Sequence, residues 1–262
     1  MSHVPPVAAG PCPNCGSEGP GRFCQDCGQE RGDLFPTAGA WIGEAFAETL
    51  GADGKLLRSL KALAWPPGEL TLEWQRGRRA RFVSPVRLYL ALALLFFLVW
   101  PNTPLADALE GFSSGFLEAG AESHGPVSAE EVSLGTQVIT ENLPGLMIIL
   151  FVPVFALALQ LMSRGSGKPF ATHLVVALHA HAVLFLCMIL ASPLSFLGTG
   201  WQDVGAPVLL LGVFAFVAGS VARVYRLGAL RAAARTAAVS VVYVVVVAFC
   251  AAGVLAVVVG RS

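Results

Sequence analysis

Long uninterrupted stretches of apolar residues fill most of the chain after residue 85. They run through residues 86–102, 144–163, 172–192, 205–225 and 236–259. Each approaches or exceeds the roughly 20 residues that an α-helix needs to cross the hydrocarbon of a bilayer. The stretches lack the long apolar–polar alternation of membrane strands, which argues against a β-barrel. The pattern therefore predicts about five transmembrane helices.

Residues 35–84, in front of the first stretch, follow an amphipathic helical pattern. A short helix is predicted after Thr37, and a second after Gly54 with apolar residues on one side and basic residues on the other (Leu56, Leu57, Leu60, Leu63 and Ala64 against Lys55, Arg58 and Lys61). Such a helix suits the membrane interface. It equally suits packing against the amino-terminal part of the protein, and both interpretations stay open.

Five arginines stand directly before the first apolar stretch, at Arg76, Arg78, Arg79, Arg81 and Arg87. Because arginine crosses a bilayer only at high cost, this junction is expected to stay on the cytoplasmic side. The cluster has a simple interpretation, in which it only fixes the topology. Alternatively, it contacts anionic lipid headgroups or binds a specific phosphate ligand.

The connections between the apolar stretches alternate in charge. Residues 103–143 contain seven acidic residues and no Lys or Arg, whereas Arg164 and Lys168 follow the second stretch. The connection after the third contains only Asp203, and the one after the fourth contains four arginines. Five helices with the amino end inside and the carboxyl end outside satisfy this alternation at every pass.

The overall composition agrees with a membrane protein. Hydrophobic residues make up 55% of the chain and charged residues 13%, with a mean hydropathy of +0.68 and no net charge. A soluble domain carries about twice that share of charged residues. We therefore expect an all-α polytopic membrane protein, with an amino-terminal module at 1–34, a juxtamembrane segment at 35–84 and a membrane domain at 85–262.

The amino-terminal module is defined by two C-x-x-C-G motifs, which contribute Cys12, Cys15, Cys24 and Cys27. Four thiolates form a closed tetrahedral set that suits structural Zn²⁺ and leaves no open position for catalysis. Disulfides, an iron site or redox thiols are the alternatives, and a reducing cytosol disfavours the first. With only Arg22 and Arg31 as bases and no row of aromatic residues, nucleic-acid binding is not expected.

Three histidines, His173, His179 and His181, lie in the predicted third transmembrane helix. At about 100° per residue they cannot all share one narrow face. Hydrogen bonding between helices is the simplest interpretation. Haem or metal ligation, proton handling and substrate contact are the functional alternatives, because polar groups at membrane depth often mark a site.

Three features together resemble a bacterial family of multi-pass membrane proteins of unknown function. They are the ribbon Cys12-Pro-Asn-Cys15-Gly with Phe23-Cys-Gln-Asp-Cys27-Gly-Gln29, the junction Gly77-Arg-Arg-Ala-Arg-Phe-Val-Ser-Pro85-Val-Arg-Leu-Tyr89, and His173-Leu-Val-Val-Ala-Leu-His179. The resemblance covers residues 12 to about 186. It implies a bacterial inner membrane and the cysteine ligands, and it carries no activity.

These features predict a non-enzymatic scaffold or adaptor, whose zinc ribbon docks a cytoplasmic protein partner or a second copy of the chain. A small-solute transporter or channel that uses the histidine-bearing helix is one alternative. A membrane haem or metal enzyme is another. No Ser/His/Asp set, phosphate-binding glycine loop or pair of acids within an apolar stretch supports other chemistry.

Overall fold

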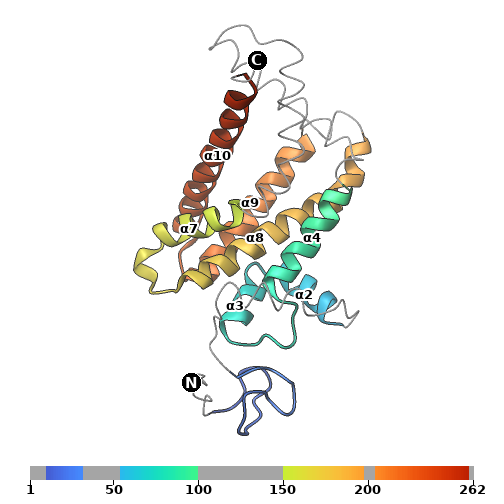
Figure 1. Ribbon diagram of the computed structural model, residues 1–262, viewed down its shortest axis with the longest axis vertical. Coiled ribbons are helices and arrows are strands. Elements are labelled where there is room, and N and C mark those ends of the chain that lie inside the picture. Colours follow the sequence, from blue (N-terminus) through green and yellow to red (C-terminus); the bar gives the residue numbers. More distant parts are fainter. Residues whose placement is uncertain (1–9, 32–53, 100–149, 198–203, 260–262) are drawn as a thin grey trace.

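The computed structural model describes residues 10–31, 54–99, 150–197 and 204–259 (Figure 1). These parts are mostly helical and contain no β-strand, so the predicted all-α class is confirmed. The predicted helix after Thr37 and the acidic connection at 103–143 lie outside the described residues. The helices are α2 (Lys55–Ala64), α3 (Glu69–Gln75), α4 (Pro85–Val99), α7 (Val152–Met162), α8 (Phe170–Ala191), α9 (Ala206–Tyr225) and α10 (Ala229–Val259), with short 3₁₀ turns η3 (Arg164–Ser166) and η4 (Ser192–Leu197).

Three helical stretches are long and apolar enough to cross a membrane: Phe170–Leu194, Pro207–Tyr225 and Ala229–Val246. The helices α4 and α7 are apolar but shorter, and the chain beyond Val99 and before residue 150 lies outside the described residues. Many apolar side chains of α9 and α10 point away from the protein, including Leu211 and Val244. Exposed apolar faces on helices of this length are those of a membrane protein in lipid.

The helix α8 is the centre of the bundle, since it contacts α4, α7 and α9 as well as α2 and α3. Its small buried residues, Ala177 and Ala182, let neighbouring helices approach closely. In the second half of α8, Phe185 stacks on Phe96 of α4 with ring centroids 5.1 Å apart. The packing of α4 on α8 therefore continues into the second halves of both helices.

The helix α10 begins earlier than the predicted fifth span. It starts at Ala229 rather than near residue 236, so Arg231 and Arg235 lie on its first turns and not in a loop. The preceding helix α9 ends at Tyr225, and Arg226 adopts a left-handed conformation with φ of 54°. The turn between α9 and α10 is short because α10 continues past its apolar part to include Arg231 and Arg235.

The juxtamembrane helices α2 and α3 lie between the ribbon and the membrane bundle (Figure 1). The packed side of α2 is formed by Ser59 and Leu63, whereas Leu57 is 75% exposed and Leu56 is 46% exposed. The predicted apolar face is thus only partly correct: Leu63 faces the protein, and the two leucines of the first turn do not. The helix α2 packs on α3 and α8, which neither interpretation named, and it presents Leu56 and Leu57 outward.

The turn between α2 and α3 fits closely against α9. Gly68 has φ of 76°, and a Cβ placed on it would lie 3.1 Å from the Cα of Ser220. Gly219 of α9 similarly faces the ring of Pro67. A residue larger than glycine at position 68 would therefore push the juxtamembrane segment away from the membrane helices.

Candidate metal centre and arginine loop

The two cysteine motifs fold into matching turns. In the first, the N–H of Gly16 donates to the carbonyl of Cys12 at 2.7 Å, and in the second the N–H of Gly28 donates to that of Cys24 at 2.9 Å. Both glycines have positive φ, 79° and 70°, as the position after C-x-x-C requires. An isolated antiparallel bridge between Phe23 and Glu30 closes the second turn.

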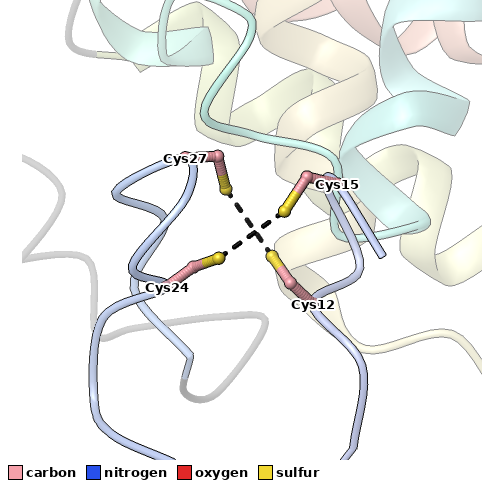
Figure 2. Close-up of side chains that lie close together, drawn as sticks. All are labelled: Cys12, Cys15, Cys24 and Cys27. Atoms are coloured by element: carbon pink, nitrogen blue, oxygen red, sulfur yellow. Dashed lines mark hydrogen bonds between the residues drawn. The ribbon is translucent and has the colours of Figure 1, made fainter. Parts of the chain in front are cut away.

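The four cysteine sulfurs converge on one point (Figure 2). All Sγ atoms of Cys12, Cys15, Cys24 and Cys27 lie within 4.8 Å of one another, with Cys12 to Cys27 at 3.7 Å and Cys15 to Cys24 at 3.5 Å. A tetrahedron with metal–sulfur bonds of about 2.3 Å has edges of roughly 3.8 Å. The donor set therefore fits a four-coordinate metal ion bound by thiolates.

The thiols of this cluster differ in acidity. Backbone N–H groups of Cys27 and Asp26 lower the pKa of Cys24 to about 6. The N–H of Ser17 favours the Cys15 thiolate, but desolvation and the neighbouring sulfurs outweigh it and raise the pKa of Cys15 to about 12. Near neutral pH, Cys24 is thus ready to bind a cation, and metal binding must displace the proton of Cys15.

Both basic residues of the ribbon are engaged within it. The buried guanidinium of Arg31 donates to the carbonyls of Gly19 and Ser17, at 2.9 Å for Ser17, and so ties the two turns together. The exposed Arg22 pairs with Glu30 at 2.7 Å. Both arginines therefore stabilise the fold of the ribbon itself.

The side chain of Gln29 joins the ribbon to the juxtamembrane segment. Its Nε2 donates to the carbonyl of Gly77 at 2.7 Å, and its Oε1 accepts from the N–H groups of Arg79 and Ala80, both at 3.0 Å. Gln29 is only 8% exposed, and its backbone carbonyl accepts a hydrogen bond from the N–H of Cys24. The residue that closes the second cysteine turn therefore also holds the loop before the apolar helix α4.

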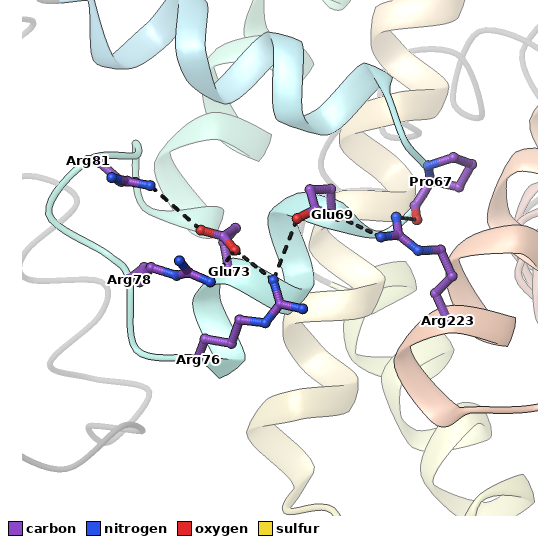
Figure 3. Close-up of polar contacts among 7 residues, drawn as sticks. All are labelled: Pro67, Glu69, Glu73, Arg76, Arg78, Arg81 and Arg223. Atoms are coloured by element: carbon purple, nitrogen blue, oxygen red, sulfur yellow. Dashed lines mark hydrogen bonds and ion pairs between the residues drawn. The ribbon is translucent and has the colours of Figure 1, made fainter. Parts of the chain in front are cut away.

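We call residues 76–84, between α3 and α4, the arginine loop. Three of its arginine side chains gather around Glu73, whose side chain is 9% exposed (Figure 3). The carboxylate of Glu73 lies 2.8 Å from Arg76, 3.0 Å from Arg78 and 3.9 Å from Arg81. A buried carboxylate needs such partners, because an unpaired charge away from water is strongly unfavourable.

Two further contacts fix the arginine loop against α2. The hydroxyl of the buried Ser59 accepts from the N–H of Val83 at 2.9 Å. Arg58 donates from Nη1 to the carbonyl of Arg81 at 3.2 Å. Together with Gln29, these contacts hold the loop from two sides.

Basic residues from the other connections meet the same end of the bundle. Arg223 of α9 donates to the carbonyl of Pro67 at 2.7 Å and to Glu69 at 2.6 Å (Figure 3). Lys168, after α7, reaches Gln75 at 3.4 Å. The basic connections predicted from the sequence thus converge at the end that carries the ribbon.

The three histidines of α8 do not form one site. His173 bonds through Nδ1 to the hydroxyl of Tyr225 on α9 at 2.7 Å, and His179 bonds to Thr71 of α3 at 2.8 Å. His181 donates from Nδ1 to the carbonyl of Ala177 at 2.8 Å. Two of the three histidines therefore make the contacts between elements that the simplest interpretation predicts.

The surroundings of these histidines are closely packed. His181 lies among aromatic rings, including those of Phe155 at 5.4 Å and Tyr243 at 5.8 Å between centroids. A cavity of about 20 Å³ lies between α2, α3, α8 and α9, lined by His179, Thr71, Ser220 and mostly apolar residues. A cavity of this size holds about one water molecule.

Comparison with known proteins finds one family. The sequence model of a family described as "Protein of unknown function (DUF3667)" matches residues 53–97. The match covers α2, α3, the arginine loop and most of α4, and leaves the cysteine ribbon and the histidine-bearing helix outside. No curated protein and no solved structure matches the chain. The part that resembles known proteins is therefore the junction between the ribbon and the membrane domain.

Sequence reasoning missed the residues that organise this junction. The sequence pattern marks Gln29 only as the last residue of the ribbon motif and predicts no role for Glu73. One signal was present for Glu73, which stands three residues before Arg76 on a helix and close to a run of arginines. No signal in one sequence connects Gln29 with residues about fifty positions later.

Proposed function

We propose that the chain is a non-enzymatic scaffold of the bacterial inner membrane, and that its ribbon binds structural Zn²⁺ and docks a cytoplasmic protein partner. The observation that carries the proposal is the closed set of four sulfurs. Zinc suits a tetrahedral all-cysteine site in a reducing compartment. With all four positions occupied by the protein, the metal supplies folding energy to a module too small for its own core.

The orientation follows from charge. The arginine loop and the basic residues after α7 and α9 meet at one end of the bundle, and basic loops stay in the cytoplasm. This rule places the ribbon inside the cell. With five passes, the carboxyl end lies outside.

The ribbon offers an exposed aromatic residue to a partner. Phe23 is 55% exposed, and the guanidinium of Arg22 lies 5.6 Å from its ring centre. Aromatic and arginine side chains are the usual anchors of protein interfaces. Gln29 contacts the arginine loop, whereas Phe23 remains 55% exposed.

A photocrosslinking amino acid placed at position 23 of the full-length protein tests this proposal in intact cells. We expect an adduct heavier than the monomer, which disappears when Cys24→Ser removes a metal ligand. The same crosslinker at Leu161, an exposed residue of α7, serves as the control. An adduct of twice the monomer mass would make the partner a second copy of the chain. The proposal fails if position 23 gives no adduct that depends on the cysteines.

The transporter and the haem or metal enzyme gain no separate support. Among the described residues, the cavity beside His179 has room for about one water molecule, and His173 and His179 each have a side-chain partner. We therefore keep the scaffold as the proposed function, with the closed cysteine set as its support.

A further inference from the structure

We propose that the arginine loop is a binding site for a phosphate group, and that Gln29 of the ribbon holds the loop in the conformation that binds. The site consists of the guanidinium groups of Arg76, Arg78 and Arg81 around Glu73. This inference does not depend on partner docking at Phe23.

The first argument is the balance of charge. Three arginines of the loop share the one carboxylate of Glu73. The neighbouring Glu69 lies 3.6 Å from Arg76, but it makes its shorter contact, 2.6 Å, with Arg223. Four guanidinium groups therefore surround two carboxylates. The cluster keeps an excess of positive charge that an anion can neutralise.

The second argument is the supply of hydrogen-bond donors. Contacts with Glu73 use Nη1 of Arg76, Nη2 of Arg78 and Nη1 of Arg81. The other terminal nitrogen of each guanidinium has no protein partner in the part of the chain that the structure describes. These side chains are 50%, 35% and 44% exposed, so the remaining donors are accessible. Guanidinium forks of this kind match the oxygens of phosphate.

The third argument is that the site is preorganised. Glu73 holds three long arginine side chains in place before any ligand binds (Figure 3). The cost in conformational entropy of ordering them is therefore not charged to ligand binding. Gln29 fixes the backbone beneath them through the carbonyl of Gly77 and the N–H groups of Arg79 and Ala80. Since Gln29 directly follows the second cysteine turn, metal binding by the ribbon keeps it in place.

The position of the loop identifies where the phosphate comes from. The apolar helix α4 begins at Pro85, directly after the loop. Residues at the entry of a membrane helix lie at the level of the lipid headgroups, and anionic lipids concentrate phosphate there. A headgroup phosphate is therefore the nearest source, and free phosphate is the other.

Binding of phosphatidylglycerol to the full-length zinc-loaded protein in detergent, followed by native mass spectrometry, tests the site. The variant Arg76→Gln/Arg78→Gln should bind this lipid at least fivefold more weakly than the wild type. The control Arg22→Gln/Arg164→Gln, which removes the same charge from two exposed arginines elsewhere, should bind as the wild type does. Phosphatidylcholine, which has no net charge, should bind weakly and equally to all three proteins.

Inorganic phosphate distinguishes the two sources. If millimolar phosphate displaces phosphatidylglycerol, the site accepts free phosphate; if it does not, the site needs the lipid, and either result supports a phosphate site. Undiminished lipid binding by the loop variant would overturn the proposal. Should that variant not fold, Arg76→Lys/Arg78→Lys keeps the charge but removes the fork, and wild-type affinity in it would contradict the proposal equally.

The role of Gln29 as a positioning residue has its own test. Gln29→Leu should keep the metal content of the wild type while its phosphatidylglycerol binding falls at least threefold. Gln25→Leu, an exposed glutamine of the same ribbon, is the matched control and should change neither property. If Gln29→Leu binds the lipid like the wild type, the ribbon does not position the loop. Crosslinking at position 23 is independent of both variants, so the two proposals can fail separately.

Discussion

Individual residues at the junction do more than the apolar pattern around them suggests. Gln29 makes three hydrogen bonds to the backbone of another segment, and Glu73 holds three arginines. Both side chains are almost fully buried, so the loss of either would leave polar partners without compensation. The geometry of the junction therefore depends on a few polar contacts.

At the scale of residues, the cysteine cluster should bind Zn²⁺ more weakly as the pH falls. Protons compete with the metal for sulfur, and the pKa of Cys24, about 6, marks where this thiolate becomes protonated. Because this pKa lies below the ordinary thiol value of about 8.5, the thiolate persists above pH 6 and disappears below it. Competition with a chromophoric chelator at pH 8, 7 and 6 measures the affinity. An affinity that does not change over this range would exclude thiolate ligands.

The variant Glu73→Gln should destabilise the protein because it leaves Arg78 and Arg81 with no carboxylate and Arg76 with only Glu69, at 3.6 Å. We expect a loss of about 1–2 kcal/mol, at the low end for a buried pair since the arginines are partly exposed. This corresponds to a fall in Tm of roughly 2–8 °C, measured by thermal unfolding in detergent. Glu30→Gln removes an exposed ion pair and should change Tm little. Equal effects of the two substitutions would contradict the role given to Glu73.

At the scale of elements, the turn between α2 and α3 couples the juxtamembrane segment to the membrane helices. Gly68 and Pro67 pack against Gly219 and Ser220, and Arg223 caps the contact from α9. This contact brings segments about 150 residues apart together. Its closeness depends on the absence of a side chain at position 68.

Gly68→Ala tests that contact. Its φ of 76° disfavours a side chain, and the added Cβ would lie 3.1 Å from backbone of α9. We expect a loss of about 1–3 kcal/mol in unfolding free energy, seen as a lower Tm in detergent. Gly165→Ala is the control, because nothing lies within 4 Å of its Cβ. If both substitutions are tolerated alike, the turn is not packed against α9 as described.

At the scale of the whole molecule, the all-α membrane class was predictable because apolar length and loop charge are local properties of the sequence. The cysteine set was also predictable, since four ligands occur within sixteen positions. The start of α10 was missed because Arg231 and Arg235 break the apolar stretch without breaking the helix. The contacts of Gln29 and of Gly68 join segments far apart in the sequence, and such pairs cannot be predicted from a single sequence.

The orientation of the molecule can be tested with reporter fusions in bacteria. A fluorescent protein fused after residue 166, in the turn after α7, should be active if that turn is cytoplasmic, as we propose. An alkaline phosphatase fused after residue 262 should be active if the chain makes the proposed five passes and its carboxyl end lies outside. Phosphatase activity at residue 166 would reverse the orientation, and its absence at residue 262 would change the number of passes.

The most direct test of the central claim, that the metal-bound ribbon holds the arginine loop, is hydrogen exchange of the peptide covering residues 77–83. The N–H groups of Arg79 and Ala80 donate to Gln29, and that of Val83 donates to Ser59. Removal of zinc by a chelator should speed exchange at Arg79 and Ala80 and leave Val83 protected. Identical exchange at all three positions with and without metal would contradict the account.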